Sequence, residues 1–182
     1  MIPKNARIAY QGDIFRVYEW EQKLFDGKIK TFEAVKPKES VQVFVIEGDE
    51  LIYVQEQQPH IKPYLGLAGG LCADWDEDPL VAAQREVVEE LGITGSFRKV
   101  FSLKRDGKLY LATHYYVCNV EKYTNTSLDP GGEKISAQRI RLTDMLTLMR
   151  KKEFRNQDVR HYVEDIQREG RFEEFLTTLK KE

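Results

Sequence analysis

The sequence predicts an α/β fold with one mixed β-sheet, because strand and helix patterns interleave along most of the chain. The apolar run at residues 41–46 is typical of a strand buried on both faces. A helix pattern with clear start and stop signals follows at residues 78–92. With 182 residues, 41% of them hydrophobic, the chain can bury one ordinary core and carry a small appendage.

The first part of the chain looks like strands rather than helices. Residues 14–20 and 29–35 alternate β-branched and aromatic residues, and Asp26-Gly27 between them is a turn signal. Pro37 interrupts this pattern before the apolar run begins. We therefore expect an N-terminal β extension over residues 1–38 and a main domain over residues 39–182.

The main domain continues with further strand and helix signals. Gly48-Asp49 turns the chain into a strand at 51–54, and a loop rich in Pro and Gly at 59–70 precedes the helix. Later elements are expected in the following order: strands at 100–103 and 109–120 joined by an Asp106-Gly107 turn, a loop at 125–134, a strand at 135–142, a helix through Met149 capped by Thr143-Asp144, and one or two amphipathic helices within 156–181, broken near Gly170.

Composition excludes several classes of function. The chain has 28 basic and 30 acidic residues, well mixed, so we expect no nucleic-acid partner. It has neither a run of ~20 apolar residues nor a secretory segment at its start, which predicts a cytoplasmic protein with no membrane partner. Cys72 and Cys118 suit small buried hydrophobes, and the three histidines lie far apart in sequence. Metal chemistry would have to use carboxylates.

The helix at 78–92 carries the strongest chemical signal. Asp78 can cap it, Pro79 suits its first turn and Gly92 can end it. At about 100° per residue, one side gathers Leu80, Ala83, Val87 and Leu91, and another gathers Glu86, Glu89 and Glu90. Neighbouring like charges repel each other, so a cation is expected there, and Mg²⁺ or Mn²⁺ are the hard ions that prefer oxygen ligands. The alternative is a solvated acidic face.

Together with Glu77, this segment resembles the Nudix box: a glutamate, seven residues, and then Arg85-Glu86-Val87-Val88-Glu89-Glu90-Leu91-Gly92-Ile93. The family pattern has a glycine where this chain has Leu71, and Gly69 and Gly70 stand just before it. An insertion of one residue within 71–76 would restore the match. The resemblance implies a Nudix-type α/β/α sandwich with a mixed β-sheet, here with an N-terminal β extension, and an altered loop before the helix.

The resemblance also assigns roles to individual residues. It implies that Glu86 and Glu90 bind the metal directly, that Glu89 and Glu77 support it, and that Arg85 orients the glutamates. A loop carbonyl from Ala68 or Gly69 would complete the metal site. Related enzymes often carry a further glutamate on a later loop, which makes Glu133 a general base or extra metal ligand, although Pro130-Gly131-Gly132 is first of all a turn sequence. The catalytic group is thus expected to comprise Arg85, Glu86, Glu89, Glu90 and Glu133.

The predicted extension is similar to the N-terminal sheet of the ADP-ribose pyrophosphatase and nucleoside diphosphate sugar hydrolase branch. This similarity implies a homodimer and hydrolysis of the pyrophosphate bond of ADP-ribose or a nucleotide sugar, giving a nucleoside monophosphate and a phosphorylated product. In the extension, Phe15, Tyr18 or Trp20 can stack on an adenine or belong to the core. The branch often has an arginine where this chain reads Gln55-Glu56-Gln57-Gln58. Four cations can compensate or lie at solvated strand edges: Arg98, Lys99, Lys104 and Arg105.

Two other functions remain open. A Nudix hydrolase can act on dinucleoside polyphosphates or nucleoside triphosphates, although the N-terminal extension disfavours the latter. A Nudix module can also sense a nucleotide without cleaving it. Because such modules usually lose box glutamates and this chain keeps all four, catalysis is the favoured reading.

Overall fold

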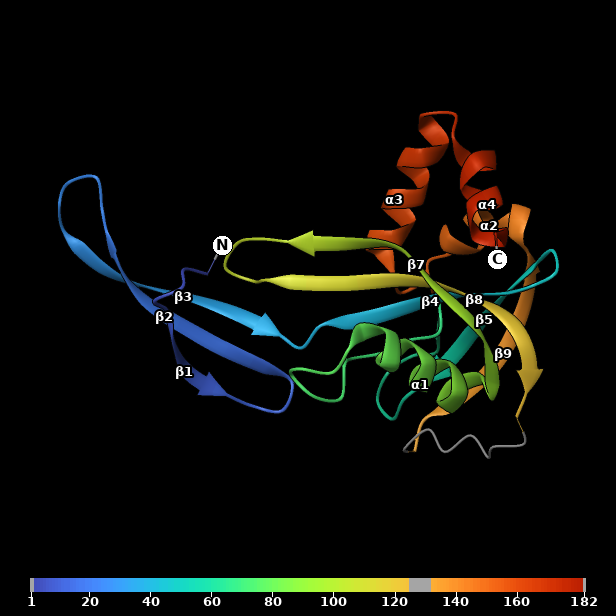
Figure 1. The fold of residues 1–182 in the computed structure, drawn as a ribbon, viewed down its shortest axis with the longest axis horizontal. Coiled ribbons are helices and arrows are strands. Elements are labelled where there is room, and N and C mark those ends of the chain that lie inside the picture. Colours follow the sequence, from blue (N-terminus) through green and yellow to red (C-terminus); the bar gives the residue numbers. More distant parts are fainter. Residues whose placement is uncertain (1, 125–131, 182) are drawn as a thin grey trace.

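The computed structural model describes residues 2–124 and 132–181, which form two β-sheets and four α-helices (Figure 1). The strands are β1 (Arg7–Gln11), β2 (Phe15–Lys23), β3 (Ile29–Pro37), β4 (Ser40–Glu47), β5 (Glu50–Gln57), β6 (Tyr64–Gly66), β7 (Ile93–Arg105), β8 (Leu111–Tyr123) and β9 (Lys134–Arg141). The helices are α1 (Pro79–Leu91), a 3₁₀ turn (Leu142–Asp144) leading into α2 (Met145–Met149), α3 (Gln157–Arg168) and α4 (Phe172–Lys180).

The main sheet is mixed. Its strands run in the order β6-β5-β4-β8-β7, and β9 also pairs with β5. The β4–β8 pair is parallel and the other pairs are antiparallel. β5 pairs with β4 only near the start of β5, and with β6 near the end of β5. The first half of β4 is therefore not paired with β5. The loop that follows β6 pairs with this free half through Ala68 and Leu71, which brings the loop close to α1.

Helices cover both faces of the main sheet, as Figure 1 shows. In β4, Val41, Val43 and Val45 pack with the buried side of α1, whereas Phe44 and Ile46 pack with α2, α3 and α4. This alternation follows from the two-residue period of a strand, and burial on both faces explains the apolar run at residues 43–46. The predicted α/β/α sandwich is therefore confirmed.

The N-terminal sheet, in the order β1-β2-β3, extends away from the main sheet (Figure 1). Backbone hydrogen bonds join the two parts where Val35 N donates to Lys108 O at 2.8 Å and Tyr110 N donates to Val35 O at 2.8 Å. Two of the aromatic residues considered for adenine stacking lie beside another ring of the N-terminal sheet. The ring centroids of Trp20 and Phe32 are 6.1 Å apart, and those of Phe15 and Tyr10 are 5.7 Å apart. The domain boundary at residue 38 stays a prediction.

Several elements differ from their predicted form. The sequence patterns predicted neither β1 nor the three-residue β6, and they gave only a short part of β7. β6 exists because β5 offers a partner edge, which local residue preferences do not encode. Asp144 does stand at the start of α2, but its side chain makes no capping hydrogen bond and pairs with Arg141 at 3.2 Å instead.

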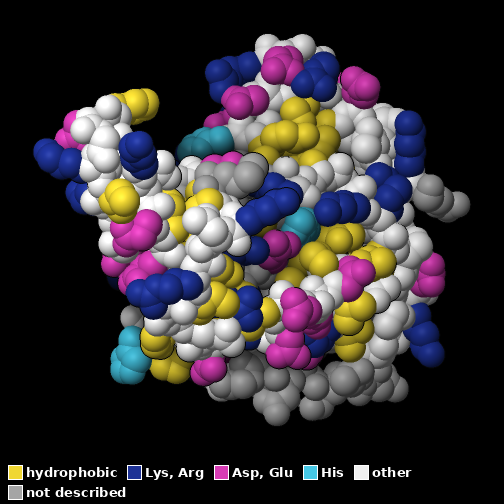
Figure 2. All heavy atoms as spheres, turned by 60° about the vertical axis from the view of Figure 1, so that its left-hand side comes forward, with side chains coloured by type: hydrophobic (Ala, Val, Ile, Leu, Met, Phe, Trp, Pro, Cys, Tyr) yellow, Lys and Arg dark blue, Asp and Glu magenta, His cyan; other side chains and the backbone are white. Residues whose placement is uncertain are grey.

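The surface carries charges of both signs. On the face shown in Figure 2, basic and acidic side chains lie among one another, and a notch separates the N-terminal sheet at the left from the helices above. Cys72 and Cys118 are both buried and free, as predicted. Among the residues described, none of the helices is long and apolar enough to cross a membrane.

Candidate active site around α1

The ends of α1 are fixed by its capping residues. Asp78 Oδ1 accepts a hydrogen bond from Leu80 N at 2.8 Å, Pro79 begins the first turn, and Gly92 takes the left-handed conformation with φ 63°. Ala82, Ala83, Val87 and Leu91 are buried against the sheet. The helix therefore presents its glutamates toward the loop that follows β6.

Glu90 is the most enclosed of these glutamates. Glu90 is only 8% exposed, and its Oε2 accepts a hydrogen bond from Gly69 N at 2.9 Å. Burial, together with the charges of Glu86, Glu56 and Glu133, raises the pKa of Glu90 to about 8 against the opposing effect of the Gly69 N–H. Carboxylates from α1, β5 and the segment before β9 therefore lie close enough to act on Glu90.

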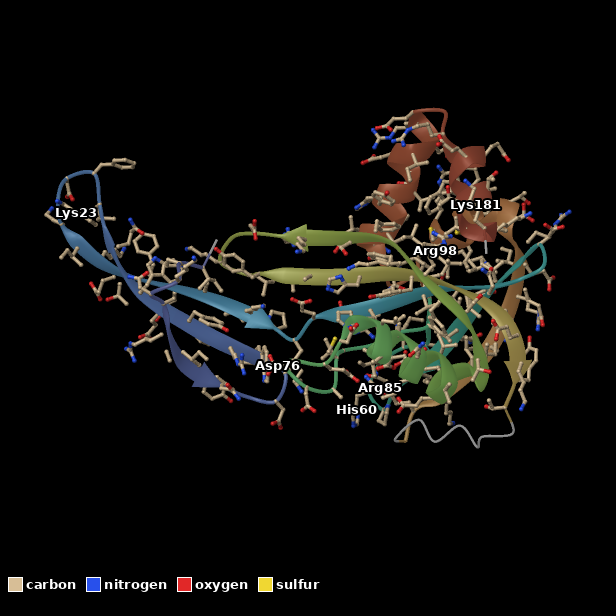
Figure 3. The ribbon with its side chains drawn as sticks, viewed as in Figure 1. Lys23, His60, Asp76, Arg85, Arg98 and Lys181 are labelled. Atoms are coloured by element: carbon tan, nitrogen blue, oxygen red, sulfur yellow. The ribbon has the colours of Figure 1, made fainter. Side chains whose placement is uncertain are left out.

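Arg85 organises the remaining box glutamates. Its Nη1 donates to Glu86 Oε1 at 2.8 Å and to Glu89 Oε2 at 3.0 Å, and its Nε lies 3.5 Å from Glu77 Oε1. Its Nη2 donates to Leu71 O at 3.0 Å, which ties the helix to the preceding loop. Figure 3 shows Arg85 on α1, on the side of the loop that carries His60. Burial raises the pKa of Glu86, and Arg85 opposes that increase.

Two glycines let the loop approach both the sheet and the helix. A Cβ atom on Gly69 would lie 2.2 Å from Val41 O, and its φ of 145° also disfavours other residues. A Cβ atom on Gly70 would lie 2.6 Å from Glu86 Oε1. Gly70 therefore lets the loop approach Glu86 closely, and it stands one position before Leu71, where the family pattern has its glycine.

The loop at residues 71–77 includes the segment 71–76 in which a one-residue insertion was predicted. Lys38 Nζ donates to Ala73 O, and Cys72 N donates to Glu39 O at 2.9 Å. The guanidinium carbon of Arg16 lies 4.0 Å from the centroid of the Trp75 ring, a cation–π distance. The altered loop therefore rests against β2 and against the link between β3 and β4.

Glu56 also belongs to this site, although the motif analysis did not select it. It is 8% exposed, and the Gln58 side-chain amide donates to Glu56 Oε1 and to Glu133 Oε1, each at 2.7 Å. Burial and the charge of Glu56 raise the pKa of Glu133. The sequence signal for Glu56 is the alternation of side chains along β5. Ile52 and Val54 face α1, so Glu56, two residues further on, lies on the same face of the strand. A charge on a buried face calls for a functional reason.

The structure places Glu133 near enough to Glu90 on α1 for its charge to raise the pKa of Glu90, whereas residues 129–131 of its predicted loop lie outside the described residues. The Ala68 carbonyl, predicted to face a metal, accepts a hydrogen bond from Val43 N at 2.8 Å. Among residues 2–124 and 132–181, no group of three or more Asp, Glu, His or Cys side chains is arranged so that it could hold a metal ion.

The four cations expected to compensate for a missing arginine lie elsewhere. Arg98 Nη2 donates to Thr178 O at 2.5 Å near the end of α4, and Figure 3 shows Arg98 close to Lys181. Lys99 Nζ lies 3.0 Å from His114 Nδ1. Lys104 and Arg105 line a cavity of about 370 Å³ between the β7–β8 hairpin and α3.

Comparisons with known proteins agree with this fold. The family model described as NUDIX domain matches residues 36–163, so the chain belongs to the Nudix family. Its class is that of a Nudix hydrolase. The crystal structure of an ADP compounds hydrolase is 22% identical and superposes with a TM-score of 0.67, covering 92% of this chain and 95% of that one. At this identity the likeness concerns the fold. No curated protein matches the chain.

Proposed function

We propose that this Nudix hydrolase cleaves the pyrophosphate bond of a nucleoside diphosphate linked to another group, with ADP-ribose or a nucleotide sugar as the favoured substrate. The products would be a nucleoside monophosphate and a phosphorylated second product. The observation that carries this proposal is the convergence of carboxylates from α1, β5 and the region before β9 beside Gly69, with Glu90 and Glu56 buried. The neighbouring fold of an ADP compounds hydrolase supports the substrate class.

Mg²⁺ or Mn²⁺ is the cofactor that suits this group of donors. The donors are carboxylate oxygens, which hard divalent ions prefer. Burial and the neighbouring carboxylates disfavour the ionised form of Glu90, and a divalent cation bound beside it would stabilise that form. We assign direct binding to Glu86 and Glu90 and supporting contacts to Glu89 and Glu77. Ala68 can contribute its carbonyl through the lone pair that Val43 leaves free.

When bound, the metal would neutralise the diphosphate and polarise its phosphorus for attack by water. The chain's own residues prepare that reaction. Arg85 holds the carboxylates of Glu86 and Glu89 in place, and Gly69 N fixes Glu90. Glu133 has a raised pKa and a fixed position through Gln58, which suits a general base that takes a proton from water or an additional ligand.

The N-terminal sheet supports the proposed homodimer. Large apolar side chains remain exposed on and beside its strands: Ile8, Tyr10, Ile14, Phe15, Phe25, Ile29 and Phe32. An exposed apolar area of this kind is typical of a protein–protein interface, and a second copy of the chain is the partner that we propose. A cytoplasmic location stays a prediction.

The substrate class can be tested with purified full-length protein. We would incubate it with Mg²⁺, with Mn²⁺ or with EDTA, and with ADP-ribose, nucleotide sugars, dinucleoside polyphosphates and nucleoside triphosphates, and separate the products by chromatography. We expect ADP-ribose or a nucleotide sugar to yield a nucleoside monophosphate only with the metal. Preferred cleavage of the polyphosphates would replace the substrate assignment, and binding without cleavage would favour a nucleotide sensor.

A further inference from the structure

Arg155, just before α3, forms part of the wall of a cavity beside the active site. The cavity has a volume of about 210 Å³, and its other lining residues include Glu56, Tyr64, Gly69 and Gly70. At ~30 Å³ for each water in the liquid, this space corresponds to about seven waters, enough for a phosphate or diphosphate group. Gly69 and Gly70 also contact the metal-binding glutamates of α1, so the cavity adjoins the proposed site of bond cleavage.

Both the backbone and the side chain of Arg155 are held in place. Its backbone N donates to Leu65 O at 2.9 Å, and Leu65 N donates to Glu153 O at 2.9 Å, so this segment pairs with β6. Its Nη1 donates to the Tyr64 hydroxyl oxygen at 2.6 Å, and its guanidinium carbon lies 4.7 Å from the centroid of that ring. The guanidinium is therefore positioned before any ligand arrives, which lowers the entropic cost of binding.

Within the described part of the chain, the Arg155 guanidinium contacts Tyr64 and makes no close ion pair with a carboxylate. Its charge reaches Glu133, whose pKa it lowers against the effects of burial and Glu56. Most other arginines near charged groups are paired, as Arg85 is with three glutamates. A positioned guanidinium that keeps free donors beside a cavity is suited to bind an anion, since its planar fork matches two phosphate oxygens.

We propose that Arg155, positioned by Tyr64, binds a phosphate group of the substrate in this cavity and so contributes to recognition of the diphosphate. The inference rests on the proposed function for the identity of the substrate. Residues 55–58 at the end of β5 contribute no cation, and Arg98 and Lys99 are engaged on other parts of the sheet. Arg155 thus supplies positive charge that the end of β5 does not provide.

The test is equilibrium binding to the full chain in Mg²⁺. The probe is α,β-methylene-ADP, whose bridging carbon prevents cleavage between its phosphates, and adenosine serves as the ligand without phosphate. We expect Arg155→Gln to weaken binding of α,β-methylene-ADP by about ten- to a hundred-fold, the value of a charge-assisted pair of hydrogen bonds. Adenosine binding should stay unchanged. Arg155→Lys should lie between, and Tyr64→Phe should cause a smaller loss.

A matched control is Arg168→Gln at the far end of α3, which should leave both affinities unaltered. Thermal unfolding of each variant would separate a binding defect from misfolding. The inference is overturned if Arg155→Gln leaves the affinity for α,β-methylene-ADP unchanged or weakens both ligands equally. It is also overturned if Arg155→Gln combined with Glu133→Gln restores the affinity, because Arg155 would then act as a counter-ion for the acidic group.

The same assay separates this inference from the proposed function. If the wild type cleaves a member of the substrate panel but Arg155→Gln binds the probe normally, the hydrolase stands and the phosphate site falls. If the wild type cleaves nothing and still binds the probe through Arg155, the phosphate site stands and the proposed hydrolysis falls.

Discussion

The adjacent glycines before α1, Gly69 and Gly70, look equivalent in sequence, but different neighbours exclude a side chain at each of them. At Gly69 an added Cβ would meet the Val41 backbone, which has no room to move. At Gly70 it would meet only the Glu86 carboxylate, the far end of a flexible side chain. The first glycine is therefore required by the fold, and the second by the position of a proposed metal ligand.

We predict that Gly69→Ala and Gly70→Ala separate stability from activity. Gly69→Ala should lower the free energy of unfolding by about 1–3 kcal/mol, because it combines an unfavourable φ with a backbone clash. Gly70→Ala should stay within about 1 kcal/mol of the wild type and lose about tenfold in turnover as Glu86 is displaced. Chemical denaturation and steady-state kinetics measure both effects. Equal loss of stability in the two variants would contradict this distinction.

Arg85 acts on activity through the carboxylates that it holds. We predict that Arg85→Lys weakens Mg²⁺ activation of the enzyme by about ten- to a hundred-fold, because one ammonium group cannot replace contacts to Glu86, Glu89 and Leu71 O together. Titration of turnover with Mg²⁺ measures this effect. Arg139→Lys on β9 serves as the control, and an unchanged Mg²⁺ requirement in Arg85→Lys would remove Arg85 from this role.

Among the elements, the link between β3 and β4 connects the N-terminal sheet to the active-site loop. Glu39 Oε2 lies 2.7 Å from His114 Nε2 on β8, and Glu39 O accepts a hydrogen bond from Cys72 N. Burial alone would raise the pKa of Glu39, but the hydrogen bond and charge of His114, with Lys36 and Lys104, hold it below its ordinary value of 4.5. The ionised form of Glu39 is therefore favoured by folding.

This depressed pKa fixes the sign of a pH effect on stability. Glu39 contributes stability above its unfolded pKa near 4.5, and the contribution is lost as pH falls through the lower folded value. We expect the difference in unfolding free energy between wild type and Glu39→Gln to shrink from pH 7 to pH 3. It should remain under about 1 kcal/mol because Glu39 is more than a third exposed. Glu33→Gln is the control, and a difference that grows toward pH 3 would contradict the prediction.

The elements also show how far sequence reasoning reaches. The ends of α1 were predictable because Asp78, Pro79 and Gly92 specify them locally. β4 was predictable because burial on both faces leaves an uninterrupted apolar run. β6 and the role of Glu56 depend on which strands meet at the split end of the sheet, and Arg155 depends on where α3 docks. Such contacts between distant segments leave no periodic signal.

At the scale of the whole molecule, the N-terminal sheet leaves apolar side chains exposed at a distance from the main core. Figure 3 shows Lys23 at the tip of this sheet, far from Arg85. A single chain does not cover this surface, and the homodimer that we propose would do so.

We predict a dimer in sedimentation at micromolar concentration, and we expect Ile29→Asp in β3 to convert it to a monomer. A charge placed within an apolar interface opposes association because it must lose its hydration. Ile61→Asp changes an exposed isoleucine of the main domain and should leave the dimer intact. A wild-type monomer, or equal effects of both substitutions, would rule out this interface.

The proposal that the α1 glutamates carry metal-dependent hydrolysis is tested most directly by the turnover of ADP-ribose in Mg²⁺ by wild type, Glu90→Gln and Gln84→Ala, the last changing an exposed position on the same helix. We predict that Glu90→Gln loses on the order of a thousand-fold in turnover, because a metal ligand contributes several kcal/mol of charge stabilisation. Gln84→Ala should retain wild-type turnover. Cleavage by Glu90→Gln at the wild-type rate would contradict the assignment.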